Sequence, residues 1–259
     1  MDVAEQQLDL DTLNALFETS TPQQVVDWAV AQFGDGVVMS SSFGAESALL
    51  IHMAALRKPD VKVVFTDTGY LFPETFQHLE SLRQRFNLNV WTYRTRADPI
   101  AYLKDAGEPD PANRLDVDRC CGVNKNEPFD RAMKELAPKA WLRGIRRNQA
   151  DTRKARQFIE WSPRYGCYAI SPLLNMTSRD IYRYMKDHDL PYHPLYEQGY
   201  LSIGCNPLSC TRPVMPGDDP RSGRWAGKGK VECGLNVDSP PTDAVPAPGA
   251  RPMPEETRS

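Results

Sequence analysis

Six cysteines supply the most reactive side chains of this 259-residue chain. Cys120 and Cys121 are adjacent, Cys205 and Cys210 are separated by four residues, and Cys233 lies in Glu-Cys-Gly-Leu near the C-terminus. Four thiolates brought together would suit an iron–sulfur cluster or a zinc ion, although buried free thiols would explain the same residues. Cys233 could instead act as a nucleophile if nearby cations lower its thiol pKa from the usual value of about 8.5. The cysteines therefore indicate metal binding, thiol chemistry or both.

Positively charged side chains form a second group. They are Lys125, Arg143, Arg146, Arg147, Arg153, Arg221 and Arg224. Guanidinium groups bind anions through charge-assisted, often bidentate hydrogen bonds. Any one of these cations is best interpreted as a solvated surface charge, but the set as a whole is consistent with an anionic ligand.

Two turns rich in small residues could hold that ligand. Residues 40–47, SSSFGAES, lead from a predicted strand into a predicted helix, where backbone N–H groups and the helix N-terminus favour an anion. The glycine spacings of the dinucleotide fingerprint and of the P-loop are both absent, so an ordinary strand-to-helix turn is the alternative. Residues 66–69, TDTG, would lie at the same edge and could contact a ribose or a base, or simply lead into the next helix.

The elements that position these residues alternate between helices and strands. Helical spacing predicts helices over 20–34, 48–56 and 73–86, and apolar runs predict strands over 37–39, 61–65, 88–93 and 140–142. This alternation is typical of an α/β fold with a doubly wound, mostly parallel sheet that helices cover on both faces. Cys167 has no nearby partner and is expected in the core.

Composition narrows the class of protein. Hydrophobic residues make up 41% and charged residues 25%, which are globular values. The net charge of −3 gives no indication of a nucleic acid or a membrane as partner. No apolar run approaches the roughly 20 residues of a membrane helix, and the acidic N-terminus does not resemble a signal peptide. We therefore expect a cytoplasmic protein, where disulfides are rare, and a homo-oligomer of unspecified order.

Six segments together resemble a known family. They are SSSFGAES, FTDTGYLFPET, CCGVNKNEPF, RGIRRNQADTR, DPRSGRW and ECGLN. In this order, over roughly residues 20–236, they resemble the adenylyl-sulfate and phosphoadenylyl-sulfate reductases of sulfate assimilation. The resemblance implies that SSSFGAES is a modified pyrophosphate loop that binds the nucleotide phosphosulfate.

The resemblance also implies roles for single residues. Cys233 would attack the activated sulfate and form an S-sulfocysteine, from which reduced thioredoxin or glutaredoxin would release sulfite. The expected substrate-binding residues are Ser41, Ser42 and Gly44 for phosphate, Gly144 and Arg153 for the nucleotide, and Lys125, Arg221 and Arg224 near the sulfate.

The family divides by cofactor and substrate. Adenylyl-sulfate reductases hold one [4Fe–4S] cluster with a double cysteine and a later Cys-x-x-Cys, whereas enzymes specific for the 3′-phosphorylated nucleotide commonly lack all four cysteines. The resemblance therefore implies a [4Fe–4S] cluster on Cys120, Cys121, Cys205 and Cys210 and adenylyl sulfate as substrate, with phosphoadenylyl sulfate as the alternative.

Four departures from the family pattern bear on this choice. The second cysteine pair is two residues longer, Asn124 replaces arginine, Asn236 replaces histidine, and Ser47 stands where many adenylyl-sulfate enzymes have aspartate.

Two other classes of protein would explain parts of the same sequence. One is an adenylating ATP pyrophosphatase, which expects a Gly-Gly pair that is absent here. The other is a non-catalytic redox sensor that binds an iron–sulfur cluster or zinc.

The chain is expected to divide into four segments. Residues 1–19 would form an N-terminal helical segment and residues 20–215 the nucleotide-binding reductase domain. Helical periodicity disappears from Tyr192 onward, so residues 216–236 would form a flexible arm that carries Cys233. The proline-rich residues 237–259 are expected to be disordered.

Overall fold

The structure, a computed structural model, describes residues 8–96, 114–206, 210–215, 217–226, 230, 232 and 234–236. Within these residues, six strands form one sheet in the order β3-β2-β1-β4-β6-β5. The strands are β1 (Val37–Ser40), β2 (Lys62–Thr66), β3 (Asn89–Tyr93), β4 (Ala140–Leu142), β5 (Ile159–Ser162) and β6 (Cys167–Ile170). Neighbouring strands are parallel except for β5 and β6. The predicted mostly parallel sheet is confirmed.

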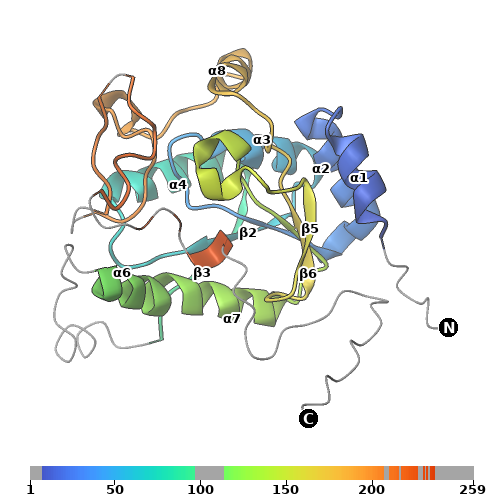
Figure 1. The fold of residues 1–259 in the computed structure, drawn as a ribbon, viewed down its shortest axis with the longest axis horizontal. Coiled ribbons are helices and arrows are strands. Elements are labelled where there is room, and N and C mark those ends of the chain that lie inside the picture. Colours follow the sequence, from blue (N-terminus) through green and yellow to red (C-terminus); the bar gives the residue numbers. More distant parts are fainter. Residues whose placement is uncertain are drawn as a thin grey trace, which may run out of the picture.

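Helices cover both faces of this sheet. They are α1 (Leu10–Phe17), α2 (Pro22–Phe33), α3 (Ala48–Arg57), α4 (Pro73–Phe86), α6 (Arg114–Cys121), α7 (Glu127–Leu136) and α8 (Ser178–Asp187). Figure 1 shows α2, α3 and α4 on one face and α6 and α7 on the other. The three predicted helices correspond to α2, α3 and α4, and the four predicted strands to β1 through β4.

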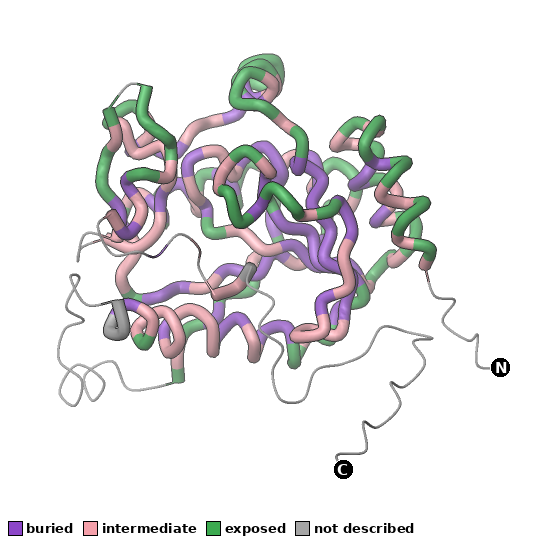
Figure 2. Tube along the Cα trace, in the orientation of Figure 1, coloured by how far each residue is buried: buried purple, intermediate pink, exposed green. Residues whose placement is uncertain are grey.

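The strands alternate their side chains between two apolar cores. Val37 and Met39 of β1 pack in the larger core, on the side of α2 and α3, whereas Val38 packs with Phe129 and Trp141 on the side of α7. Successive side chains of a strand point to opposite faces, so a strand with helices on both sides is apolar throughout. Figure 2 shows the resulting buried centre of the molecule, with exposed residues on the outer helices.

Local sequence signals set the start of α2. The Thr21 hydroxyl accepts the backbone N–H of Gln24 at 3.2 Å, and the Gln24 side chain accepts the backbone N–H of Thr21 at 2.8 Å. This capping box satisfies two N–H groups that the first turn would otherwise leave unpaired, and Pro22 needs no donor at that position. The predicted start of the helix at the Ser20-Thr21-Pro22 segment is confirmed.

Strands β5 and β6 form an edge hairpin that hydrophobic spacing does not predict. Each contains only four residues, and Glu160 and Ser162 interrupt the apolar pattern of β5. Cys167 in β6 is fully buried, which confirms its predicted place in the core.

Helix α1 belongs to the same packed unit. Phe17 is 2% exposed and lies in the larger core. The Asn14 carboxamide donates to the Ile159 carbonyl and accepts the Ile159 N–H, both at 3.0 Å, on the outer edge of β5. In the part of the chain that the structure describes, no helix is both long and apolar enough to cross a bilayer.

Candidate active site

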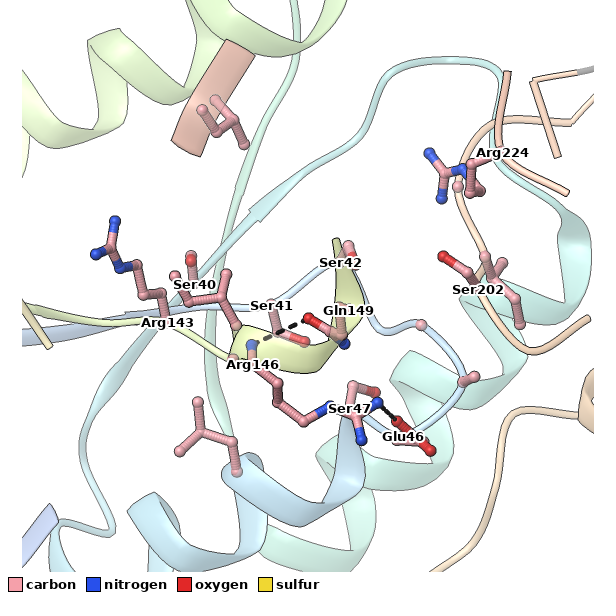
Figure 3. Close-up of a pocket in the computed structure, with 18 of the residues that line it drawn as sticks. Ser40, Ser41, Ser42, Glu46, Ser47, Arg143, Arg146, Gln149, Ser202 and Arg224 are labelled. Carbon is pink, nitrogen blue, oxygen red and sulfur yellow. Dashed lines mark hydrogen bonds and ion pairs between the residues drawn. The ribbon is translucent and has the colours of Figure 1, made fainter. Parts of the chain in front are cut away.

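A cleft opens at the topological switch point of the sheet. The chain runs from β1 through β2 to β3 on one side, whereas β4 lies on the other side of β1. Ligands of open α/β sheets bind in the crevice that such a reversal leaves at the carboxyl ends of the strands. Here the crevice has a volume of about 270 Å³, and Ser41, Ser42, Gly44 and Gly144 all line it. Figure 3 shows Ser42 and Gln149 on one side of this cleft, across from Ser202 and Arg224.

The loop after β1 is held in a fixed shape. Ser41 Oγ accepts the backbone N–H of Phe43 at 3.0 Å, and Ser40 Oγ accepts the indole N–H of Trp141 at 2.7 Å. Phe43 adopts a left-handed backbone conformation (φ 48°), which is uncommon for a residue other than glycine. Its buried ring packs edge-on against Phe65, with centroids 5.3 Å apart. This anchoring presents the serine-rich turn to the cleft ahead of α3, where an anion would be favoured.

The turn after β2 is held by its own carboxylate. The Asp67 side chain is buried, accepts the backbone N–H of Gly69 at 2.9 Å and pairs with Arg94 at 2.6 Å. The contact of this turn with a ribose or base stays a prediction. Thr66 and Thr68 of the same turn do line the cleft.

The cations that line the cleft fall into two groups, those that pair with a carboxylate of the protein and those that form no such pair among the described residues. Lys125, Arg153, Arg221 and Arg224 all line it. Arg153 binds the Glu232 carboxylate through two hydrogen bonds of 2.6 and 2.8 Å, and Arg221 lies 3.5 Å from the same carboxylate. Lys125 and Arg224 form no ion pair with any residue that the structure describes, and the buried Nε of Arg224 has no hydrogen-bond partner there. Their charges are thus available to an anionic ligand.

The remaining arginines of the predicted set are committed to other carboxylates. Arg143 lines the cleft and pairs with Glu160. Arg147 is not part of the lining and pairs with Glu18 at 2.6 Å. Arg146 pairs with Glu46 at 2.6 Å inside the cleft. Burial raises the pKa of Glu46, and the Arg146 charge opposes this shift. Sequence reasoning missed Glu46 as a cleft residue because its partner lies 100 positions away in the chain.

The four cysteines of the predicted metal site line one small cavity of about 30 Å³ beside the cleft. A backbone bridge to Leu71 brings Cys205 there, and a bridge between Thr211 and Arg224 brings the segment after Cys210 alongside. Burial raises the pKa of Cys120 to about 11, and the three other thiols add to the shift, whereas a hydrogen bond from Asn124 opposes it. Lys125 and Arg224 line both spaces, so the cysteine cavity adjoins the cleft.

Four cysteines supply the number of ligands that either a [4Fe–4S] cluster or a zinc ion requires. All four line the same cavity, and no disulfide joins those in the described residues, so their thiols are available to such a group. Among the described residues, no three His, Cys, Asp or Glu side chains are grouped closely enough to hold one metal ion. The choice of a cluster over zinc therefore rests on the family resemblance alone.

A π-helical turn, Gly122–Asn126, joins α6 to α7 and carries Asn124 and Lys125. Pro128 accounts for this turn, because proline lacks an N–H and its ring collides with the carbonyl four residues earlier in a regular α-helix. The wider turn relieves that collision, and such turns are frequent at functional sites. Asn124, which replaces the family arginine, is buried and donates to Cys120 Sγ at 3.5 Å.

The described residues of the C-terminal arm lie against the cleft. Glu232 and Leu235 form part of its lining, and Leu235 also packs against Val117 and Trp225. Cys233, together with the predicted disordered tail 237–259, lies outside the described residues. Glu232 and Leu235 of this arm thus contact the cleft in this structure, and the predicted flexibility of the arm stays a prediction.

Comparison with known proteins places these features in a family context. Residues 36–213 match the family described as phosphoadenosine phosphosulfate reductase domain. The phosphoadenosine 5′-phosphosulfate reductase of a Synechococcus species is 38% identical over 88% of this chain and 97% of its own length. The adenosine 5′-phosphosulfate reductase of Salinibacter ruber is 35% identical over 92% of each chain. Relatives with both substrate names thus match almost along their full length.

Solved structures show the same fold. The phosphoadenylyl-sulfate reductase of Candida auris, in a phosphate complex, superposes with a TM-score of 0.67 and 26% identity over 79% of this chain and 98% of its own. The FMN adenylyltransferase of Candida glabrata, in complex with ATP, reaches a TM-score of 0.56 at 16% identity, over 82% of this chain and 67% of its own. The second likeness concerns the fold alone.

Proposed function

Because the chain belongs to the phosphoadenosine phosphosulfate reductase domain family, we propose that it reduces adenylyl sulfate to sulfite and AMP. The observation that carries this proposal is the switch-point cleft, in which a serine-rich turn faces Lys125 and Arg224. Neither cation is neutralised by a described residue, so the cleft is suited to a strongly anionic ligand such as a phosphosulfate.

The lining suggests how the nucleotide lies. Leu50, Ile145, Leu173 and Ile181 give one part of the cleft apolar walls, which would suit the adenine ring. Ser41, Ser42 and Gly44 would hold the phosphate at the N-terminal side of α3, and Gly144 and Arg153 would contact the nucleotide. Lys125, Arg221 and Arg224 would then surround the sulfate.

Cys233 is the proposed nucleophile. Its two neighbours in the chain are both held by arginines, Glu232 by Arg153 and Gly234 by Arg164. The Cys233 thiolate would attack the sulfate sulfur, the bond between that sulfur and the bridging oxygen would break, and AMP would leave with the electron pair. The cations would favour the thiolate and stabilise the charge on the leaving phosphate.

The second half-reaction requires a dithiol partner, for which we propose a reduced thioredoxin or glutaredoxin. One partner thiolate would attack Cys233 Sγ of the S-sulfocysteine and release sulfite. A mixed disulfide would then join the partner to Cys233. The second partner thiolate would then displace the Cys233 thiolate. The two electrons that reduce the sulfate thus come from the partner, which ends as a disulfide.

We also propose that Cys120, Cys121, Cys205 and Cys210 hold a [4Fe–4S] cluster. When bound, the cluster would supply a fixed charge beside Lys125 that tunes the electric field at the sulfate. Lys125 would orient the sulfate, since it lines both the cysteine cavity and the cleft.

Phosphoadenylyl sulfate is the second candidate substrate, and Ser47 is the observation that favours it. Ser47 lines the cleft where a family aspartate would repel a 3′-phosphate, and its hydroxyl lies 3.4 Å from His78 Nε2. The four cysteines and Lys125 favour the unphosphorylated nucleotide, which therefore remains the first proposal.

An assay with both nucleotides tests the function. Wild-type protein should release sulfite from adenylyl sulfate with a dithiol reductant, and mass spectrometry without reductant should find a sulfonate adduct on the peptide that contains Cys233. Cys233→Ser should abolish sulfite release and leave AMP binding intact, because a serine hydroxyl without an activating base is a poor nucleophile. Sulfite release by Cys233→Ser would contradict the mechanism, and a preference for the 3′-phosphorylated nucleotide would select the second substrate.

A further inference from the structure

The residue after Cys233 is held by an arginine that lies outside the lining of the cleft. Arg164 Nη1 donates to the Gly234 carbonyl at 2.8 Å, and Nη2 of the same guanidinium pairs with Asp130 at 2.7 Å. The Arg164 side chain is 19% exposed, so these contacts form in a partly desolvated place. Arg164 is absent from the lining of the cleft. It therefore contacts the arm and not the proposed substrate.

The position of Arg164 is fixed by a rigid hairpin. It lies in the turn between β5 and β6, which the Gly166 N–H closes onto the Ser162 carbonyl at 2.8 Å. The neighbouring Tyr165 ring packs edge-on against Phe129 and Trp141, with centroids 5.4 and 5.5 Å apart. A side chain on such a support loses less conformational freedom when it binds than one on a loose loop.

Two further contacts hold the same short segment. Gly234 approaches the π-helical turn so closely that a Cβ at this position would collide with the Asn126 amide. Leu235 packs against two apolar clusters, one that contains Val117 and Trp225 and one that contains Phe129 and Trp141. On the other side of Cys233, Arg153 holds Glu232. Contacts of different chemistry thus constrain the chain both before and after the cysteine.

We infer that Arg164, braced by Asp130, is a positioning residue that docks Gly234, the residue after Cys233, onto the folded domain. The inference rests on the proposed role of Cys233 as nucleophile. With Gly234 already held, less of the arm has to be ordered for the attack, so part of that entropy is lost before the substrate arrives. Release of sulfite by the dithiol partner does not need this docking, because the partner approaches from solvent.

Hydrogen exchange of the full-length protein, measured by mass spectrometry without nucleotide, tests the docking directly. Arg164→Ala should speed exchange in peptides that cover residues 231–237 by about tenfold, the effect of one lost hydrogen bond to a charged group. Arg164→Lys, which keeps the charge and a donor, should give an exchange rate between those of the wild type and Arg164→Ala. Gly234→Ala provides a second variant outside the folded core and should speed exchange in the same peptides. Arg57→Ala, a surface arginine paired with Asp27, is the matched control and should leave them unchanged.

Single-turnover kinetics then tests positioning. Arg164→Ala should slow formation of the sulfonate adduct by about tenfold, while AMP affinity and the reduction of preformed adduct stay at wild-type values. Wild-type exchange in both Arg164→Ala and Gly234→Ala would overturn the docking, and faster exchange with unchanged adduct formation would overturn the positioning role. Faster exchange of β1 and β4 as well would show general destabilisation and also count against the proposal. Failure of wild-type protein to form any adduct would refute the proposed function, while the exchange result would still decide the docking.

Discussion

At the scale of single residues, the arginines that line the cleft differ in whether a carboxylate of the protein pairs with them. Arg224 is the one that has no such pair among the described residues. Arg224 places its guanidinium over the Trp225 ring at 4.5 Å and against Gly204, where any side chain would collide with it. Its buried Nε lacks a partner among the described residues. Burying a polar group without a hydrogen bond costs free energy, which a hydrogen bond from Arg224 to the proposed substrate would offset.

Arg224→Ala should therefore lower kcat/KM by about tenfold or more, because one charge-assisted hydrogen bond to the substrate is lost. Its midpoint of thermal unfolding should stay close to that of the wild type, since no ion pair within the described protein is broken. Steady-state kinetics and a thermal melt measure the two effects, with Arg57→Ala as the control. An unchanged kcat/KM would show that Arg224 is not a substrate residue.

Residue types were more predictable than residue partners. The family resemblance implied that Lys125, Arg153, Arg221 and Arg224 bind the substrate, and all four line the cleft. Their pairing was unpredictable, since Arg153 meets Glu232 across 79 positions of the chain. The Asp67 carboxylate is likewise committed within the protein, to the Gly69 N–H of its own turn.

At the scale of elements, two buried histidines join α4 to its neighbours. His78 in α4 contacts Ser47 ahead of α3, and His193 after α8 contacts Thr75 in α4 at 3.1 Å. The rings lie 5.4 Å apart. Burial lowers the pKa of both histidines to about 4, from an ordinary value of 6.5. Glu74 opposes the shift of His193, and the neighbouring ring adds to that of His78.

The free energy of unfolding should therefore fall as the pH decreases below 6.5. Between pH 6.5 and 4 the unfolded chain binds protons at these positions and the folded protein does not, so stability present above pH 6.5 is lost progressively towards pH 4. Between pH 7.5 and 5 the loss should be about 2 kcal/mol for each histidine.

Urea unfolding of wild type and His78→Gln at both pH values measures this loss. The variant should be less stable at pH 7.5 but should lose less stability on acidification. His188→Gln, which changes an exposed histidine, is the control. Equal pH dependence in wild type and His78→Gln would refute the assignment.

Element prediction succeeded where long periodic segments or caps were present. The capping box of α2 and the apolar runs of β1 and β2 are local signals, and local signals can be seen in a sequence. The hairpin β5–β6 is short and stabilised by partners far away in the chain, including Asn14. The π-helical turn was equally invisible, because Pro128 alone predicts a helix start as readily as a widened turn.

At the scale of the whole molecule, the proposed cluster would join three separate parts of the chain. Cys120 and Cys121 end α6, whereas Cys205 and Cys210 lie in the segments that bridge to the turn after β2 and to Arg224. Protein purified without oxygen should contain about four irons per chain and a broad visible absorbance. Both should be lost in Cys121→Ser, and the thermal midpoint of that variant should fall because the cross-link between distant segments is lost.

Cys167→Ser is the matched control for iron content, since Cys167 is buried in β6 away from the four-cysteine cavity. Metal analysis that finds one zinc would contradict the cluster, as would iron-free protein of full activity. The second result would also shift the substrate proposal towards the phosphorylated nucleotide.

The Asn14 carboxamide has a consequence for how the chain can be shortened. By offering both a donor and an acceptor to Ile159, it occupies a place on the edge of β5 that a strand from another molecule would otherwise take. Removal of residues 1–19 would uncover this edge and, with the loss of Phe17, an apolar surface beside it. A truncated protein would thus be prone to aggregate even though no cleft residue had been touched. Expression should therefore retain the first helix.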